Sequence, residues 1–201
     1  MPVILRRLSR SFYNQKTLTV AQALLGKFLV HRVSGEEQVG QIVETEAYMG
    51  LDDQASHASR GKTNRTALMF GPPGFAYVYL IYGMYHCFNV VTEEEGYPAA
   101  VLIRALDPVL IESQAAIVSG GKRLEKWANG PGKLCRYMQI DRNLNGADLC
   151  ESALLIEDRG VTIEPSKIVA AKRIGIPYAG AWKEKPWRFY LKDSPSVSKR
   201  D

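Results

Sequence analysis

The chain has 201 residues, of which 46% are hydrophobic and 23% are charged, and its formal net charge at pH 7 is +5. This balance is that of a soluble globular protein of one domain, and the modest basic excess permits nucleic-acid binding without requiring it. No apolar run approaches the ~20 residues that span a bilayer, and the N-terminus is too poor in apolar side chains for a signal peptide.

The first regular segment predicts a helix over residues 17–25. Thr17 or Thr19 is a suitable N-cap, because a hydroxyl can accept a hydrogen bond from a free backbone N–H group. Gly26 stands where a helix commonly ends. The strand pattern begins directly after this glycine.

Two strands and a turn predict a hairpin after this helix. The strands cover residues 27–33 and 38–49, and Ser34-Gly35 between them is a turn signal. Residues 50–74 are then rich in Gly, Asp, Ser and Thr, which predicts a loop. A loop of that length is uncommon inside a compact domain unless it is functional.

Most of the remaining segments read as strands. They are residues 77–82, 86–92, 99–106, 154–157, 167–173 and 188–192, with Asp107-Pro108 ending the third. Helices are expected over residues 110–118 and 133–138. Because the connections are mostly short, the fold class is α+β: a single domain over residues 1–201, with a curved, mostly antiparallel β-sheet and surrounding helices.

The sequence Gly130-Pro131-Gly132 before the second of these helices has two interpretations. Free backbone N–H groups at a helix start can hold a phosphate. An ordinary loop before a helix has the same composition, and the sequence does not separate the two.

An acidic strand, IVETEAY (42–48), is the first segment with chemical content. Side chains alternate faces along a strand, so Glu44, Glu46 and Tyr48 share one face. Adjacent acids on one face are typical of a solvated side of a sheet. A carboxylate beside an aromatic wall can instead be a general base or a nucleophile, and the spacing does not separate these roles.

A tyrosine ladder, YVYLIYGMY (77–85), holds four of the ten tyrosines of the chain. In a regular strand Tyr77 and Tyr79 share a face, whereas Tyr82 points to the other face unless Gly83 bends the chain. Tyrosine is a normal strand and core residue, so a structural role is one interpretation. The other is a pocket for a flat ring attached to a polyanion, with an exposed Tyr82 as a wedge between base steps.

Three further polar side chains have open roles. His57 in the long loop is either a surface residue or presents its imidazole plane or backbone N–H to a ligand. Asn89 lies in the strand that follows the tyrosine ladder. Arg104 interrupts the otherwise apolar segment VLIRAL (101–106), where an isolated arginine pairs with a carboxylate for a structural or a catalytic reason.

The cysteines and histidines argue against a metal site. Cys87, Cys135 and Cys150 form no CxxC pair, which favours a reducing cytoplasm. The three histidines are equally scattered, so zinc is not expected. We expect neither a metal ion nor an organic cofactor.

Together these segments resemble the alkyladenine (3-methyladenine) DNA glycosylase family of the vertebrate type. The matching segments are VETEAY (43–48), TNR (63–65), MF (69–70), YVYLIYGMYHCFN (77–89), VLIRALDP (101–108), GPGKLC (130–135) and KPWRFY (185–190). They occur in the order of the family, and the resemblance runs from about residue 5 to residue 198. Several unlike motifs in one order are far more specific than any single motif.

The resemblance implies hydrolysis of the N-glycosidic bond of damaged purines in duplex DNA. Glu46 matches the general base that activates water, and Arg104 matches the arginine that helps to position that carboxylate. The other matches are Tyr48, His57 and Tyr79 as residues that sandwich the flipped base, Asn89 as the pocket asparagine that disfavours guanine, Tyr82 as the residue that intercalates into the vacated gap, and Met69 as a residue that packs beside this wedge.

The resemblance also implies a monofunctional enzyme of base excision repair that excises 3-methyladenine, 7-methylguanine and hypoxanthine. Its partner is double-stranded DNA that contains damaged purines, and we expect a monomer that is cytoplasmic and associated with the nucleoid. Animal members carry a long N-terminal extension, whereas this chain starts near the folded domain, which fits a bacterial-type member.

Two alternatives remain open. One is a non-catalytic nucleic-acid-binding module rich in β-structure, against which a buried Glu46 beside Tyr48 would argue. The other is a structural or protein-interaction domain in which the tyrosines form a core, and burial of all four ladder tyrosines would favour it.

Overall fold

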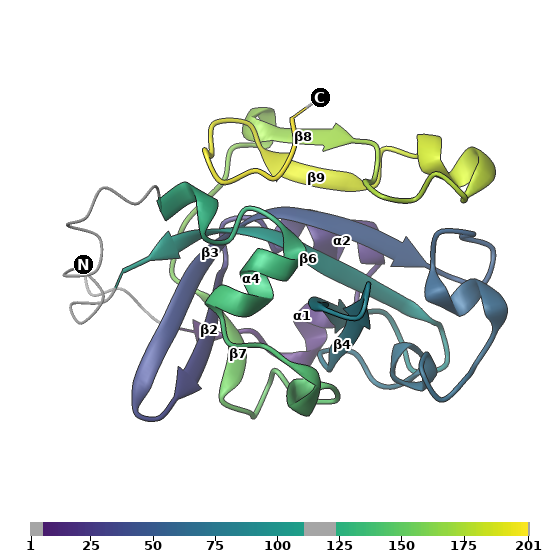
Figure 1. The fold of residues 1–201 in the computed structure, drawn as a ribbon, viewed down its shortest axis with the longest axis horizontal. Coiled ribbons are helices and arrows are strands. Elements are labelled where there is room, and N and C mark those ends of the chain that lie inside the picture. The colour runs from purple at the N-terminus through teal and green to yellow at the C-terminus, as the bar shows by residue number, and fades with distance from the viewer. Residues whose placement is uncertain (1–5, 111–123, 201) are drawn as a thin grey trace.

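A single nine-stranded sheet forms the centre of the molecule (Figure 1). The computed structural model describes residues 6–110 and 124–200. The strands are β1 (Arg6–Arg7), β2 (Phe28–Val33), β3 (Glu36–Met49), β4 (Ala76–Ile81), β5 (Tyr85–Val91), β6 (Ala99–Val109), β7 (Leu154–Asp158), β8 (Ile168–Ala171) and β9 (Arg188–Leu191). The α-helices of the described residues are α1 (Arg10–Tyr13), α2 (Thr17–Ala23) and α4 (Pro131–Tyr137).

The order of the strands places β3 near the middle of the sheet. The main path is β1-β7-β2-β3-β6-β5-β4, and β9 joins it through β3 and carries β8 at its outer edge. In Figure 1, β8 and β9 lie above β3, at the yellow end of the colour scale. The strand pairs are antiparallel, so the predicted α+β class and antiparallel sheet are confirmed.

The long strand β3 changes its partner half-way along one edge. Residues 36–41 pair with β2, residues 44–46 pair with β9, and β6 runs along the opposite edge. The register shifts between Ile42 and Thr45, which marks a β-bulge. Because a bulge adds one residue, Ile42 and Ala47 both pack in the main core, although strict alternation would place them on opposite faces.

The main hydrophobic core joins the sheet to α2 and α4. It contains buried side chains from both helices and from strands β2, β3, β5 and β6. Both helices have only seven residues and would be marginal in water alone. Packing against the sheet therefore supplies most of their stability, since each fully buried large apolar side chain contributes about 1.5–3 kcal/mol.

The predicted capping of α2 by its own threonines is wrong. The N-cap residue is Lys16, whose side chain makes no capping hydrogen bond. The Glu93 carboxylate, from the loop after β5, instead accepts hydrogen bonds from the Thr17 backbone N–H at 3.0 Å and from the Thr17 hydroxyl. A residue distant in sequence therefore satisfies this helix N-terminus, which the local sequence does not reveal.

The strand predicted over residues 99–106 continues beyond its predicted end at Asp107-Pro108 and forms β6. In β6, Pro108 pairs with Gly40 of β3. Leu106 donates its backbone N–H to Ala128 on the edge away from β3, so the nitrogen of Pro108, two residues later, also lies on that edge. The missing N–H of proline therefore costs no hydrogen bond to β3, and the strand does not end there.

Other differences concern short elements. The loop predicted over residues 50–74 contains two 3₁₀ helices, η1 (His57–Arg60) and η2 (Ala67–Phe70), and neither β1 nor α1 was predicted. The helix predicted over residues 133–138 begins earlier, at Pro131. The helix predicted over residues 110–118 lies, apart from its first residue, outside the described residues.

The β4–β5 hairpin turns at Tyr82 and Gly83, both of which have a positive φ, 54° and 70°. The predicted bend at this glycine is thus confirmed. The hairpin rests against the start of α4, because a Cβ atom on Gly132 would lie 2.9 Å from the ring of Tyr85. This close approach fixes the hairpin relative to the rest of the sheet.

Candidate active site

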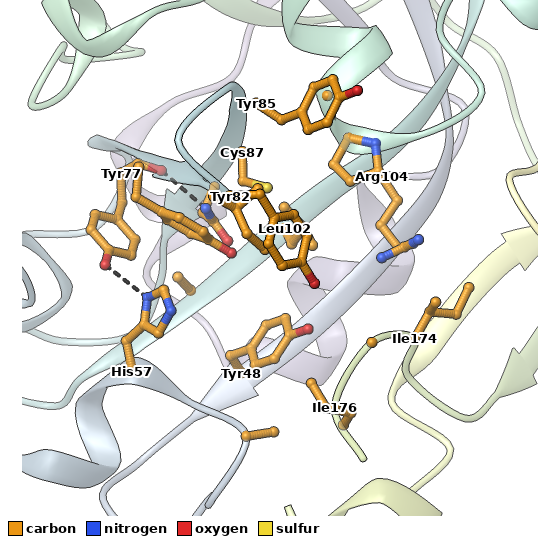
Figure 2. A pocket seen from close by; sticks show the side chains of 18 of the residues that line it. Tyr48, His57, Tyr77, Tyr82, Tyr85, Cys87, Leu102, Arg104, Ile174 and Ile176 are labelled. Carbon is orange, nitrogen blue, oxygen red and sulfur yellow. Dashed lines mark hydrogen bonds between the residues drawn. The ribbon is translucent and has the colours of Figure 1, made fainter. Parts of the chain in front are cut away.

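The described residues surround a cavity of about 360 Å³, beside the second half of β3, the β4–β5 hairpin and the segment after β8. This volume falls within the roughly 300–1,000 Å³ of small-molecule pockets. Its aromatic lining consists of Tyr48, His57, Tyr77, Tyr79, Tyr82, Tyr85 and Tyr178. Figure 2 shows Tyr48, His57 and Arg104 arranged around this space.

Glu46 lies behind the cavity wall and is fully buried. Its Oε2 accepts a hydrogen bond from the Tyr48 hydroxyl at 2.6 Å, and its Oε1 accepts one from the Ile174 backbone N–H at 2.7 Å. Arg104 Nη1 is 3.4 Å from the same Oε1. All three partners line the cavity, whereas Glu46 itself does not. Because a carboxylate has about four acceptor directions, one remains for a further donor.

Arg104 joins the two buried acidic residues of β3, Glu44 and Glu46. Its Nε is 3.4 Å from Glu44 Oε1, its Nη1 is 3.4 Å from Glu46 Oε1, and its Nη2 donates to the Ser198 hydroxyl at 3.3 Å. Burial lowers the pKa of Arg104, but attraction to Glu46 and Glu44 outweighs this and raises it above its ordinary value. Glu44 also pairs with the buried Arg188 at 3.0 Å, so two guanidinium groups balance two carboxylates.

These contacts confirm that Glu44, Glu46 and Tyr48 share one face of β3. The alternative of a solvated acidic face is wrong, because both carboxylates are fully buried. Burial, and secondarily the charge of Glu46, raise the pKa of Tyr48 well above its ordinary value. The Tyr48 hydroxyl therefore keeps its proton and donates a hydrogen bond to the carboxylate.

His57 begins η1 and borders the cavity beside the tyrosine ladder. Its ring centre is 4.6 Å from that of Tyr79, and its Nδ1 is 3.0 Å from the Tyr77 hydroxyl (Figure 2). Burial, and secondarily the charges of Arg65 and Arg60, lower the pKa of His57 to about 4. The imidazole is therefore neutral at neutral pH, and its interpretation as a plain surface residue is wrong.

Tyr77 and Tyr79 share one face of β4, as predicted, with ring centres 5.4 Å apart. Asn89 stands opposite Tyr77 in β5, and its Nδ2 donates to the Tyr77 carbonyl at 3.0 Å. This cross-strand bond fixes the amide plane where it lines the cavity. The ladder and the asparagine therefore form one rigid wall.

Tyr82 and Met69 lie at opposite extremes of exposure. Tyr82 is 80% exposed at the hairpin turn and borders the cavity. Met69 is only 2% exposed and packs with Tyr77 in a second buried cluster. Both residues line the cavity, and the expected packing of Met69 beside the wedge stays a prediction. The exposed methionine of the turn is Met84, at 66%.

The other groups at the cavity are a thiol and a helix start. Cys87 lines the wall, and burial raises its pKa. Pro131 and Gly132, the first two residues of α4, also border the cavity, and a phosphate at their backbone stays a prediction. Among the described residues, no group of three or more His, Cys, Asp and Glu is suited to a metal ion. None of the helices described is long and apolar enough to cross a membrane.

Comparison with known sequences decides the family. The family model described as methylpurine-DNA glycosylase matches residues 11–195. The chain belongs to the methylpurine-DNA glycosylase family. A relative from Methanocella arvoryzae is 53% identical, covering 100% of this chain and 98% of the relative. Relatives from Desulfitobacterium hafniense and Legionella pneumophila (strain Corby) are 50% and 47% identical, covering 96% and 97% of this chain and 99% and 100% of their own. All three bear the name "Putative 3-methyladenine DNA glycosylase".

Members of the methylpurine-DNA glycosylase family are hydrolases that act on alkylated DNA, so the chain is an enzyme of DNA repair. The structure brings together the residues to which the resemblance assigned roles. Those that line the cavity are Arg104, Tyr48, His57, Tyr79, Asn89, Tyr82 and Met69, and Glu46 lies one contact behind them. Nothing in the sequence marks Ile174, because it contributes a backbone N–H and no side-chain chemistry.

Proposed function

We propose that this member of the methylpurine-DNA glycosylase family flips alkylated purines out of duplex DNA and hydrolyses their N-glycosidic bond. Glu46 is the proposed general base. One observation carries this proposal: a fully buried carboxylate is held by Tyr48, Arg104 and Ile174, all of which line an aromatic cavity. Burying a charge is costly, and Glu44 is buried as deeply, but only one of the partners of Glu44 lines the cavity, whereas all three partners of Glu46 do.

The two alternative interpretations are less well supported. A passive nucleic-acid-binding surface has no need of a buried carboxylate bonded to Tyr48. A structural tyrosine core would require all four ladder tyrosines to be buried, whereas Tyr82 is 80% exposed and Tyr85 is 40% exposed. Exposed rings beside a cavity instead favour contact with a ligand.

The proposed reaction exchanges one bond at the sugar for another. The bond between C1′ and the purine nitrogen breaks, and the base leaves with the bonding electron pair. The oxygen of a water molecule adds to C1′ while Glu46 accepts the proton of that water. The negative charge of Glu46 also stabilises the positive charge that develops at C1′. The products are a free base and an abasic site, and Arg104 and the Ile174 N–H hold the carboxylate in place.

Tyr48, His57 and Tyr79 are the rings that we propose to hold the flipped base. Alkylation at a ring nitrogen makes a purine cationic, and a cation on an aromatic face gains about 0.5–2 kcal/mol. Because the pKa of His57 is about 4, its neutral imidazole does not repel such a base at neutral pH. We therefore infer 3-methyladenine and 7-methylguanine as substrates, with hypoxanthine as a neutral substrate. Asn89 would disfavour guanine by a clash with its amino group. 7-Methylguanine has the same amino group, and its release would rest on its being a better leaving group than guanine.

Tyr82 is the proposed wedge, because the target bond is hidden inside the duplex until the nucleotide leaves the stack. An exposed ring beside the cavity can occupy the space that the nucleotide vacates. The described lining residues include no lysine amine, so we propose a monofunctional enzyme without a Schiff-base step. We propose that it acts as a monomer on damaged double-stranded DNA, in the compartment that holds the DNA of the cell.

Replacement of Glu46 by Gln tests the general base. Glu46→Gln keeps the shape of the side chain but removes the proton acceptor, so base release should fall by about 10²- to 10⁴-fold while binding of damaged duplex is retained. The measurement uses duplexes with one hypoxanthine or one 7-methylguanine, followed by alkaline cleavage at abasic sites. Glu36→Gln, an exposed change in the same strand, is the matched control and should have no effect.

Full base release by Glu46→Gln would remove Glu46 from the mechanism. If the unaltered protein bound damaged duplex yet released no base from either substrate, the non-catalytic binding module would replace the glycosylase proposal.

A further inference from the structure

Tyr48 has a charged neighbour that the proposed reaction does not use. The guanidinium carbon of Arg173 lies over the Tyr48 ring, 4.8 Å from the ring centre. Tyr48 lines the cavity and Arg173 does not, so the guanidinium covers the ring face that is turned away from the cavity. A base stacked on Tyr48 therefore meets a ring whose other face already holds a cation.

A fully buried ion pair fixes Arg173. Its Nη1 and Nη2 donate to the two oxygens of Asp53 at 2.6 Å and 2.8 Å, and neither side chain is exposed. Nη1 also donates to the Ala47 carbonyl at 2.9 Å, and Nη2 to the Trp182 carbonyl at 3.2 Å. The ring of Trp187 lies 5.0 Å from the guanidinium carbon. This cation therefore has no freedom to turn away from Tyr48.

The same contacts join the two segments that hold the proposed general base. Ala47 follows Glu46 in β3, and its carbonyl accepts from Arg173. Ile174 follows Arg173, and its N–H donates to Glu46. One guanidinium thus links the strand that carries the carboxylate to the segment that supplies its backbone donor.

We propose, on the basis of the function proposed above, that Arg173 is a positioning residue for Tyr48 and Glu46 and also weakens the preference of the cavity for cationic over neutral purines. A base stacked at roughly 3.5 Å from the ring lies about 8 Å from the guanidinium. Like charges at this distance repel each other when little water lies between them. Asp53 offsets part of the charge, but it contacts the Nη atoms, so the guanidinium remains the group that lies on the ring. A neutral purine stacks without this repulsion.

Arg65 is another guanidinium beside a ring of the cavity, and it differs in burial. It lies 5.3 Å from the centre of the Tyr79 ring but is exposed. Solvent and salt screen an exposed charge. The buried Arg173 is therefore a fixed charge behind the Tyr48 ring, whereas the charge of Arg65 is screened.

The test compares single-turnover base release from two duplexes that differ only in one base, 7-methylguanine or hypoxanthine. The double variant Arg173→Met/Asp53→Asn removes both buried charges, and it should shift the ratio of the two rates toward 7-methylguanine by about three- to tenfold. Arg173→Lys keeps the charge but loses the forked contacts, so both rates should fall while their ratio stays the same. Asp53→Asn alone leaves the cation unbalanced and should shift the ratio toward hypoxanthine.

Arg159→Met is the matched control, because Arg159 lies over the Phe28 ring at 4.9 Å, and neither residue lines the cavity. It should change neither rate, and circular dichroism should show that each variant is folded. An unchanged ratio in both the double variant and Asp53→Asn would overturn the inference, as would an equal shift in Arg173→Lys and the double variant. Failure of the unaltered protein to release either base would instead overturn the proposed function.

Discussion

Tyr82 is both exposed and held in an unfavourable backbone conformation, a combination that a structural role does not explain. It is 80% exposed, and its φ of 54° lies in the left-handed region that bulky residues avoid. Such strain costs on the order of 1–3 kcal/mol and is common where function requires a particular side chain. With Gly83 next to it, asparagine would suit this turn far better than tyrosine.

Replacing Tyr82 by asparagine should therefore separate stability from binding. Tyr82→Asn should raise the free energy of unfolding by about 1 kcal/mol, because Asn-Gly is the favoured pair for a turn of this type. It should also weaken binding of a damaged duplex by about 1–3 kcal/mol through loss of one stacking ring. Urea unfolding and fluorescence anisotropy measure the two effects.

Tyr97→Asn is the control for the loss of an exposed aromatic ring, because Tyr97 is 40% exposed and does not line the cavity. It should leave duplex binding unchanged. Unaltered affinity in Tyr82→Asn would count against the wedge role.

The pKa of His57 predicts a pH dependence of stability. Its folded pKa of about 4 lies below the ordinary value of 6.5, so between these values the unfolded chain binds more protons than the folded protein. The contribution of neutral His57 to stability is thus fully present above pH 6.5 and is lost as the pH falls through about 4. His57→Gln should remove this part of the pH dependence. An NMR titration of the His57 ring with a midpoint near 6.5 would contradict the assignment.

At the scale of elements, the hairpin β4–β5 packs against α4 at a glycine, which has no side chain to keep the hairpin away. Gly132 has no side chain, and the ring of Tyr85 occupies the space that a Cβ atom would fill. Alanine is a better helix former than glycine by about 1 kcal/mol, so propensity alone favours substitution here. The contact with Tyr85 opposes it, since added atoms in a packed site cost about 1–3 kcal/mol.

Gly132→Ala should therefore destabilise the protein despite its gain in helix propensity. We expect a net loss of about 1–2 kcal/mol in the free energy of unfolding, together with weaker duplex binding as the hairpin moves away from α4. The double variant Gly132→Ala/Tyr85→Ala removes the clash, so it should be at least as stable as Tyr85→Ala alone. A double variant whose two losses simply add would show that the ring is not the obstacle.

The elements show which parts of the fold the sequence predicts. Alternation in β3 correctly placed Glu44, Glu46 and Tyr48 on one face, because side-chain direction in a strand is a local property. The cap of α2 by Glu93 and the Ile174 N–H at Glu46 were not predictable in this way. Both join segments distant in sequence, and their contacts depend on the completed sheet rather than on neighbouring residues.

In the site, too, some features were predictable from the local sequence and others were not. The residue types near the cavity were found from motifs, whereas the burial of Met69 and the pairing of Arg173 with Asp53 follow only from packing. The extension of β6 through Pro108 likewise depends on which edge of the strand meets a neighbour.

At the scale of the whole molecule, the net charge of +5 predicts salt-dependent binding to DNA. Each phosphate that a lysine or arginine neutralises contributes about −0.9 to the slope of log K against log salt concentration. Two or more such contacts should give a slope of about −1.8 or steeper for undamaged duplex. Glu46→Gln should show the same slope, because a buried side chain contacts no phosphate. A slope near zero would contradict binding through the DNA backbone.

The strand β3 pairs first with β2 and then with β9, so the tip of the β2–β3 hairpin lies far along the strand from the residues at the cavity. Ser34 and Gly35 form that tip, and a Cβ atom on Gly35 would meet nothing within 4 Å. The bulge and the pairing with β9 both come later in the strand, before Glu46 is reached. A dye or an affinity tag inserted at this tip therefore has a route to solvent that leaves the chemistry undisturbed, which makes it a suitable attachment point for watching single molecules search along DNA.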